Sequence, residues 1–164
     1  MENIVFAFLG GIAGALLMDA TEAFMARFGV ASGVNAALLG RWFLSLLSGR
    51  FVHQNILECP PYEREASAGW AFHLFVGGGG VALLYPLFFA ISGLPRPDNG
   101  LSGGLVFGLA TSLLPWLLLL PSFGWGVFGR RGPAGANALL ASPLSHIPYG
   151  IAVGVALSLA HQVA

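Results

Sequence analysis

The sequence contains little charge and no lysine. All seven basic side chains are arginines, seven acidic side chains balance them, and charged residues make up only 9% of the 164 positions. A soluble domain carries about 25% charged residues, so this composition argues against a soluble globular protein. The balance of charge also provides no overall field that would attract nucleic acid. We therefore expect no nucleic-acid partner.

Cysteine is almost absent as well. Cys59 is the only one, so the chain cannot form an intramolecular disulfide and has no CxxC pair for metal binding or redox chemistry. We interpret Cys59 as incidental and not as a ligand. The sequence also lacks a nucleophile-elbow pattern. We therefore assign no catalytic residue and do not classify the chain as an enzyme.

Long apolar stretches are abundant instead. Residues 66–95, 99–129 and 132–164 carry no Asp, Glu or Arg. Each stretch exceeds the roughly 20 apolar residues that cross a bilayer as an α-helix. A further apolar run near the N-terminus lacks the basic region of a signal peptide, so we count it as a span. The expected fold class is all-α, an integral membrane four-helix bundle.

We expect one membrane domain over residues 1–164, with four spans at about residues 4–25, 67–91, 101–121 and 143–161. Between the first two spans, residues 34–48 repeat apolar side chains at steps of three and four, which is helical spacing. A helix of about 15 residues is too short to span comfortably. We therefore predict an interfacial amphipathic helix between spans one and two.

The placement of arginine predicts the orientation in the membrane. Six of the seven arginines lie in the first and third connections between spans, and only Arg96 lies in the second. Cytoplasmic connections carry the excess of arginine, so both termini are predicted to lie outside. On that outer side, Arg96, Asp98 and His161 look like residues at the membrane boundary.

The ionisable residues inside the spans share stripes with small residues, which mark the faces where membrane helices pack. Asp19 and Glu22 lie on such a stripe of the first span, and His73 and His146 lie on those of the second and fourth. Alternating topology places all four at similar depth near the cytoplasmic face. We expect them to point into the bundle, because a carboxylate that faces lipid is costly.

Several short motifs carry a family resemblance over nearly the whole chain. They are Met18-Asp19, Gly40-Arg41-Trp42, Gly49-Arg50-Phe51 with His53, Pro60-Pro61 with Glu65, Gly69-Trp70 with His73, and Ser142 with His146, Tyr149 and Gly150. In this order and spacing, the chain resembles a family of small bacterial inner-membrane proteins that is catalogued only as a domain of unknown function. The resemblance implies a multi-pass protein of the bacterial inner membrane. It implies no reaction, substrate or cofactor.

Two cofactors are compatible with the cluster of ionisable residues. Asp19, Glu22, His73 and His146 form a mixed set of oxygen and nitrogen ligands that suits a divalent metal. His73 and His146 alone could instead serve as the axial ligands of a b-type haem. Haem would leave Asp19 unexplained, so a divalent metal is the preferred cofactor.

Transport is a third alternative. Intramembrane Asp, Glu and His commonly mark ion or substrate pathways. Pro115, Pro143 and Pro148 are positions where a helix can break and an unwound backbone can line a cavity. A chain of four spans needs further subunits to enclose such a path. Besides the lipid bilayer, we therefore expect a homo-oligomer or another membrane protein as the partner.

A structural role is the fourth alternative. Asp19 would then pair with a nearby group such as Arg41, and the protein would be a non-catalytic subunit or assembly partner. The function that we favour is the handling of a metal ion, a proton or a small solute near the cytoplasmic face. Arg41, His53 and Glu65 are its expected second layer, as lids or partners of the polar cluster.

Overall fold

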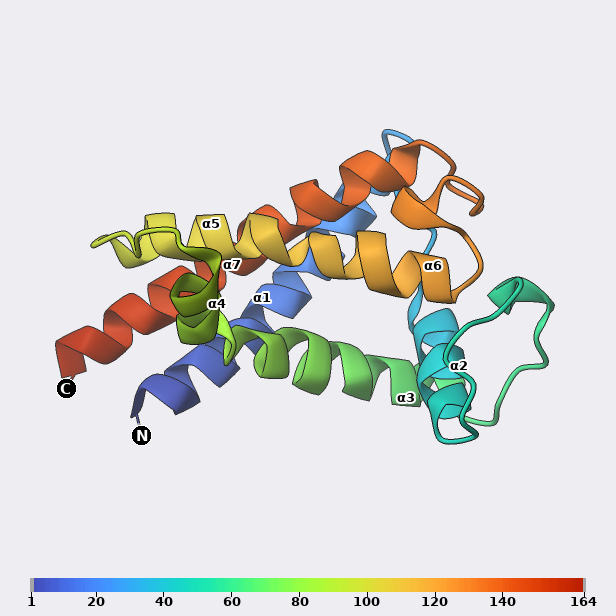
Figure 1. The fold of residues 1–164 in the computed structure, drawn as a ribbon, viewed down its shortest axis with the longest axis horizontal. Helices are drawn as coiled ribbons and strands as arrows, with labels where there is room; N and C mark the ends of the chain where they lie inside the picture. The colour runs from blue at the N-terminus through green and yellow to red at the C-terminus, as the bar shows by residue number, and fades with distance from the viewer. Residues whose placement is uncertain (1, 164) are drawn as a thin grey trace. The chain divides into compact units, whose positions relative to one another are not determined.

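The computed structural model describes residues 2–163, and within this range the chain forms helices and connections without any strand. The all-α prediction is therefore confirmed. The longer segments are drawn in Figure 1 and are α1 (Glu2–Ala26), α2 (Ala36–Leu46), α3 (Glu65–Ala71), η2 (Phe72–Gly80), α4 (Tyr85–Ser92), α5 (Gly100–Thr111) and α7 (Asn137–Val163). Shorter turns are η1 (Ile56–Glu58), η3 (Pro115–Leu119), α6 (Leu120–Ser122) and η4 (Val127–Gly129).

The lengths and composition of these helices fit a membrane protein. Ile4–Ala26, Gly100–Ser122 and Asn137–Gln162 are long and apolar enough to cross a bilayer. Glu65–Gly80 and Tyr85–Ser92 also qualify as a pair, but they are bent by 54° at the break between them. The described chain thus has three candidate spans, or four if the bent pair forms one span. The exact span boundaries stay predictions.

The contacts divide the chain into two compact units, which we describe separately. The first unit comprises Met1–Thr21, Leu74–Thr111 and Pro143–Ala164, and the second comprises Glu22–His73 and Ser112–Ser142. Neither unit is one continuous segment, and two of the boundaries fall inside α1 and α7. The single membrane domain over residues 1–164 stays a prediction.

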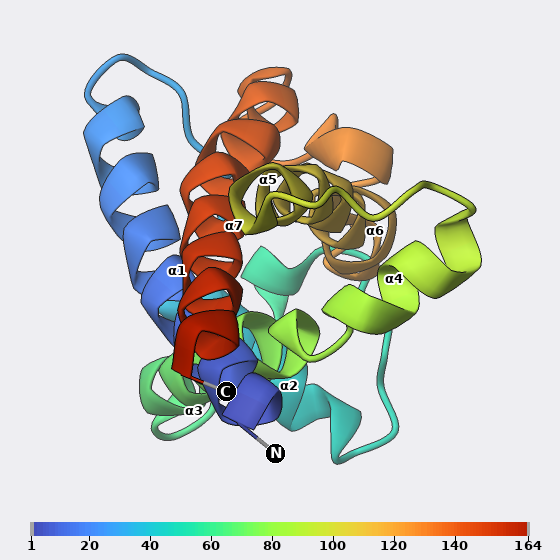
Figure 2. The same cartoon turned by 90° about the vertical axis from the view of Figure 1, so that its left-hand side faces the viewer.

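In the first unit, helices approach each other closely at glycines. A Cβ atom added at Gly104 would collide with the carbonyl oxygen of Gly150, and one added at Gly10 would collide with Ala156. Figure 2 shows the corresponding stretches of α1 and α7 side by side. The small-residue stripes that the sequence predicts as packing faces are confirmed at these positions.

Aromatic side chains complete the core of the first unit. Tyr85, Phe107 and Tyr149 are 1–2% exposed and belong to one buried cluster. The Tyr149 hydroxyl donates a hydrogen bond of 2.8 Å to the Gly78 carbonyl oxygen. Because Gly78 lies in η2, this bond gives the π-helical segment a polar anchor in α7.

In the second unit, the predicted amphipathic helix is present as α2 over Ala36–Leu46. Asn35 caps its N-terminus by accepting a hydrogen bond of 2.9 Å from the Leu38 amide. The apolar face that the periodicity identifies is buried in the core of this unit, where Trp42 is 4% exposed. α2 packs on α3 through Gly40, whose added Cβ would collide with the Glu65 carbonyl oxygen.

Pro115, Pro143 and Pro148 are the positions at which the transport alternative allows a helix to break. Pro115 begins the short π-helix η3, whereas α7 continues through Pro143 and Pro148 without interruption. The helix is therefore not broken at these two positions. Prolines are tolerated inside membrane helices because neighbouring groups can satisfy the freed backbone carbonyls.

Candidate functional site

The four residues of the predicted polar cluster are divided between the two units. The first unit contains Asp19, which is half-buried, and His146, which is 9% exposed. The second unit contains Glu22 and His73. The Glu22 carboxylate accepts hydrogen bonds from the amide of Ser32, at 2.8 Å, and from its hydroxyl. Glu22 therefore fixes the connection that follows α1.

The two histidines of that cluster contact aromatic rings. The centroid of the His73 ring lies 6.2 Å from that of Trp70, and the His146 ring lies 6.2 Å from that of Tyr149. Among residues 2–163, no three side chains of His, Cys, Asp or Glu lie close enough together to hold a metal ion. The metal site, the haem ligands and the proton path stay predictions.

Arg41 and Glu65 form a two-pronged ion pair in the second unit. Arg41 Nε and Nη2 donate to the two carboxylate oxygens of Glu65 at 2.9 and 2.8 Å, and the side chains are only 13% and 12% exposed. Arg41 Nη1 also donates to the carbonyl oxygens of Ile56 and Cys59, at 3.2 and 2.9 Å. The hydrogen bond to Glu65 raises the pKa of Arg41 above its ordinary value. The pair fastens the loop before α3 to α2.

His53 lies at the centre of a second buried polar group. Its ring is 6% exposed, with Nε2 2.9 Å from Ser45 Oγ and Nδ1 3.3 Å from Cys59 Sγ. Burial lowers the pKa of His53, and the nearby charge of Arg50 lowers it further. His53 and Cys59 also line a cavity of about 310 Å³. From the sequence, His53 is expected in the second layer of the polar cluster, and Cys59 is expected to be incidental.

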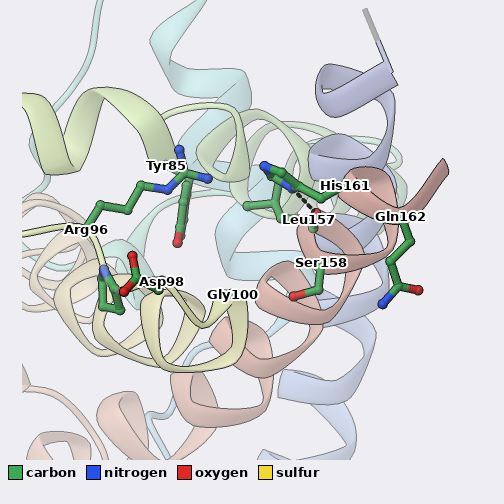
Figure 3. A pocket seen from close by; sticks show the side chains of 9 residues that line it. Tyr85, Arg96, Asp98, Gly100, Leu157, Ser158, His161 and Gln162 are labelled. Carbon is green, nitrogen blue, oxygen red and sulfur yellow. Dashed lines mark hydrogen bonds between the residues drawn. The ribbon is translucent and has the colours of Figure 1, made fainter. Parts of the chain in front are cut away.

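A polar cavity also lies in the first unit, among residues that the sequence predicts at the membrane boundary. Its volume is about 490 Å³. Its polar walls come from the connection between α4 and α5 and from the last turns of α7, and they include Tyr85, Arg96, Asp98, Ser158, His161 and Gln162. Figure 3 shows Arg96 and Asp98 on one side of this cavity and the residues of α7 on the other. We call it the Arg96–Asp98 cavity.

Aromatic and helical contacts hold the polar groups of this cavity in place. The Arg96 guanidinium lies 5.4 Å from the centre of the Tyr85 ring, a cation–π contact. His161 Nδ1 lies 2.7 Å from the Leu157 carbonyl oxygen. A carbonyl can only accept, so Nδ1 carries the hydrogen in this contact. Within the described residues, Arg96 and Asp98 form no ion pair with each other.

The sequence contains only a weak signal for this cavity. Its charged residues lie beside apolar runs, where charges are expected at membrane boundaries. Ser158, His161 and Gln162 are spaced at three and four residues, which places them on one face of a helix. That polar face near the end of an apolar helix could have suggested a site. Its pairing with the distant Arg96 and Asp98 requires the fold.

Comparison with known proteins adds the family and no activity. Residues 8–160 match the family described as protein of unknown function, DUF2938. Neither a curated protein nor a solved structure matches the chain. The family match covers almost the whole sequence and confirms the resemblance to a family of unknown function. The chain is a member of the DUF2938 family.

Proposed function

We propose that this membrane protein binds a small zwitterionic solute in the Arg96–Asp98 cavity. The observation that carries the proposal is a pair of opposite charges on the wall of a cavity in a largely apolar unit. Arg96 and Asp98 are exposed there, and neither forms an ion pair within the described part of the chain. The volume of about 490 Å³ lies in the range of small-molecule sites. A solute with both an anionic and a cationic group would match the two side chains.

Arg96 is the group that would bind the negative end of the solute. Its guanidinium presents a planar set of donors that suits a carboxylate or a phosphate. The contact with Tyr85 holds it in position before the solute arrives. Gly100, at the start of the 12-residue helix α5, also lines the cavity. The positive end of the helix dipole therefore adds to the preference for an anion.

Asp98 would bind the positive end, and α7 would supply further hydrogen-bonding groups. Ser158, His161 and Gln162 face the cavity from α7. Directional donors and acceptors of this kind recognise a polar molecule better than a bare ion. With the orientation that the arginines predict, the cavity would open on the outer side. The proposal thus retains small-solute handling, at a different place from the polar cluster of Asp19.

Binding to the full chain in lipid nanodiscs tests the proposal. Calorimetry would compare α-amino acids, phosphoethanolamine, simple carboxylates and simple amines. We expect at least one zwitterion to bind at least tenfold more tightly than analogues that lack either charge. Preference for phosphoethanolamine over the amino acids would identify a lipid headgroup as the source of the ligand. Equal binding of the singly charged analogues, or no binding of any zwitterion, would contradict the proposal.

Charge-neutral variants locate the site. We expect Arg96→Gln and Asp98→Asn each to weaken binding about tenfold or more, since a hydrogen bond to a charged group contributes about 1.5–3 kcal/mol. Arg64→Gln and Glu63→Gln are matched controls, because these side chains form an ion pair that is 85% and 91% exposed. Unchanged binding in both cavity variants would remove this cavity as the binding site.

A further inference from the structure

The cavity of about 310 Å³ in the second unit combines a nucleophile with a base. Cys59 is the only cysteine of the chain. Its Sγ lies 3.3 Å from Nδ1 of His53 and 3.6 Å from the Asn55 carbonyl oxygen. Both Cys59 and His53 line the cavity. The thiol therefore has a proton acceptor within reach and space in front of it.

The surroundings of Ser45 determine which nitrogen of His53 carries the hydrogen. Ser45 Oγ lies 2.7 Å from the Trp42 carbonyl oxygen, 3.0 Å from the Arg50 carbonyl oxygen and 2.9 Å from His53 Nε2. The hydroxyl has one hydrogen, and two carbonyls compete to accept it. Ser45 Oγ then accepts from Nε2–H of His53. Nδ1 consequently has a free lone pair directed at Cys59.

The contacts from Ser45 through His53 to Cys59 meet the requirements of an activated nucleophile. A nucleophile lies within reach of a base, and a third group orients the base. His53 is more than nine-tenths buried, and burial lowers its pKa, so the ring is neutral at pH 7 and can accept a proton. Ser45, which is 2% exposed, is the positioning residue.

The other walls of the cavity indicate the chemistry of the substrate. Arg50 offers a cation at the cavity, Gln54 offers an amide and Glu58 a carboxylate. The Glu58 carboxylate already accepts a hydrogen bond of 2.8 Å from the Asn55 side-chain amide, which leaves Arg50 as the charged group available to a ligand. Val52 lines the same cavity and is 61% exposed, and its neighbour Phe51 is 43% exposed. In a membrane protein, exposed apolar side chains of this kind suit a hydrocarbon chain. An anionic carrier with an attached acyl chain matches both features.

We propose that Cys59 accepts an acyl group from an acyl thioester, with His53 as the general base. Cys59 Sγ would form a bond to the carbonyl carbon while its proton moves to His53 Nδ1. The bond between that carbon and the sulfur of the carrier then breaks. The proton passes from His53 to the leaving thiolate, which departs as a free thiol. Nothing is oxidised or reduced, and the acyl group remains on Cys59 as a new thioester.

The full chain in nanodiscs can be tested with acetyl-CoA and palmitoyl-CoA at pH 7. We expect the intact mass to increase by one acyl group, and we expect hydroxylamine to remove it. Cys59→Ser must abolish the adduct, because the chain has no other thiol. Faster transfer from palmitoyl-CoA would support a long acyl chain as the transferred group. Equal rates would support acyl thioesters as the substrate class without a preference for chain length. Absence of any adduct would overturn the proposal.

The role of His53 needs a separate comparison, since free thiols acylate slowly by themselves. We expect His53→Gln to slow acylation at pH 7 by about a hundredfold, the lower end of general-base catalysis. Ser45→Ala should slow it less, and Ser45→Thr should restore the rate because it keeps the hydroxyl. Ser48→Ala is the matched control, because Ser48 is exposed. An unchanged rate in a folded His53→Gln variant would overturn the proposal.

The pH dependence of the unaltered chain gives a test that does not depend on folding of the variants. An unassisted thiol reacts faster with rising pH until it reaches the ordinary cysteine pKa of about 8.5. With His53 as the base, the rate of acylation should level off below pH 7. A rate that follows the unassisted profile would overturn the role of His53.

Discussion

The two units of this protein are stabilised in different ways. In the first unit, the helices of a membrane protein meet at glycines such as Gly104 and Gly150, and aromatic side chains fill the remaining space. In the second unit, much of the chain between helices is held by side chains that donate to backbone carbonyls. Arg41 donates to Ile56 and Cys59, and Trp42 Nε1 donates to Phe51 at 3.0 Å.

The difference follows from where backbone polar groups find partners. A helix satisfies its backbone hydrogen bonds internally. In an apolar environment, helices can therefore associate by close packing of complementary surfaces. A buried connection leaves carbonyls that side chains must satisfy. The first unit should therefore be sensitive to the volume of a side chain, and the second to the loss of a hydrogen-bonding or charged group. Substitutions in each unit test this difference.

The largest effect is expected in the second unit for Arg41→Leu. This change leaves the Glu65 carboxylate without its cation and takes the Arg41 donor away from the carbonyl oxygens of Ile56 and Cys59. The Ile56 oxygen then keeps only its bond of 3.3 Å from the Cys59 amide. Removal of one partner from a buried ion pair costs about 3–5 kcal/mol. We expect the free energy of unfolding, measured in mixed micelles, to fall by about 3 kcal/mol. The α2 contacts should be lost first.

The exposed ion pair of the same unit is the control. Arg64 Nε lies 3.7 Å from the Glu63 carboxylate, and both side chains are more than four-fifths exposed. Exposed pairs contribute about 0–1 kcal/mol. Arg64→Leu should therefore leave the unfolding transition almost unchanged. Equal effects of the two arginine substitutions would contradict the structural role of the Arg41–Glu65 pair.

In the first unit, the expected effect of Gly104→Ala is somewhat smaller. The added methyl group would collide with the Gly150 carbonyl oxygen and lie 2.6 Å from the Gly154 Cα. Overpacking of a tight interface costs about 1–3 kcal/mol. Ser102→Ala in the same helix is the control, because Ser102 is exposed. If Gly104→Ala and the control unfold alike, the first unit is not sensitive to side-chain volume, and the proposed difference between the units is contradicted.

The sequence predicted the helices better than the connections. Apolar length and helical periodicity predicted an all-helical membrane protein, because both depend on neighbouring residues. Trp42 shows the limit of this approach. Its position on the apolar face of α2 was evident, but its burial depends on Phe123, which lies 6.5 Å away between ring centroids and far along the chain. Burial of this kind depends on tertiary contacts that periodicity does not contain.

The sequence predicted the candidate sites less well than the helices. Arg41, His53 and Glu65 were selected from the sequence, but their actual partners follow from the folding of the loop before α3. Cys59 was set aside because no second cysteine accompanies it, whereas its partner is His53. Arg96, Asp98 and His161 were assigned to a membrane boundary. Only the approach of α7 to the α4–α5 connection makes them a cavity.

Arg96→Gln tests whether the first unit tolerates the loss of a charge. The guanidinium contacts the Tyr85 ring and forms no ion pair with Asp98 within the described residues. Loss of an exposed cation–π contact costs about 0.5–1 kcal/mol. We expect thermal unfolding to change little while binding of the zwitterionic solute weakens. A loss of stability as large as that of Arg41→Leu would contradict the contrast between the units.

The smallest expected effect is the pH dependence that His53 adds to the stability of the second unit. Burial, followed by the charge of Arg50, lowers the pKa of His53 in the folded chain below the ordinary value of about 6.5. The unfolded chain therefore binds the proton more readily, so the contribution of His53 to the free energy of unfolding is complete above pH 6.5 and is lost as the pH falls.

Carboxylates also titrate on acidification, so the useful quantity is the difference in stability between the unaltered chain and His53→Gln. Unfolding measured between pH 8 and pH 5 should show a steeper loss in the unaltered chain. Parallel curves would show that protonation of His53 does not destabilise this unit.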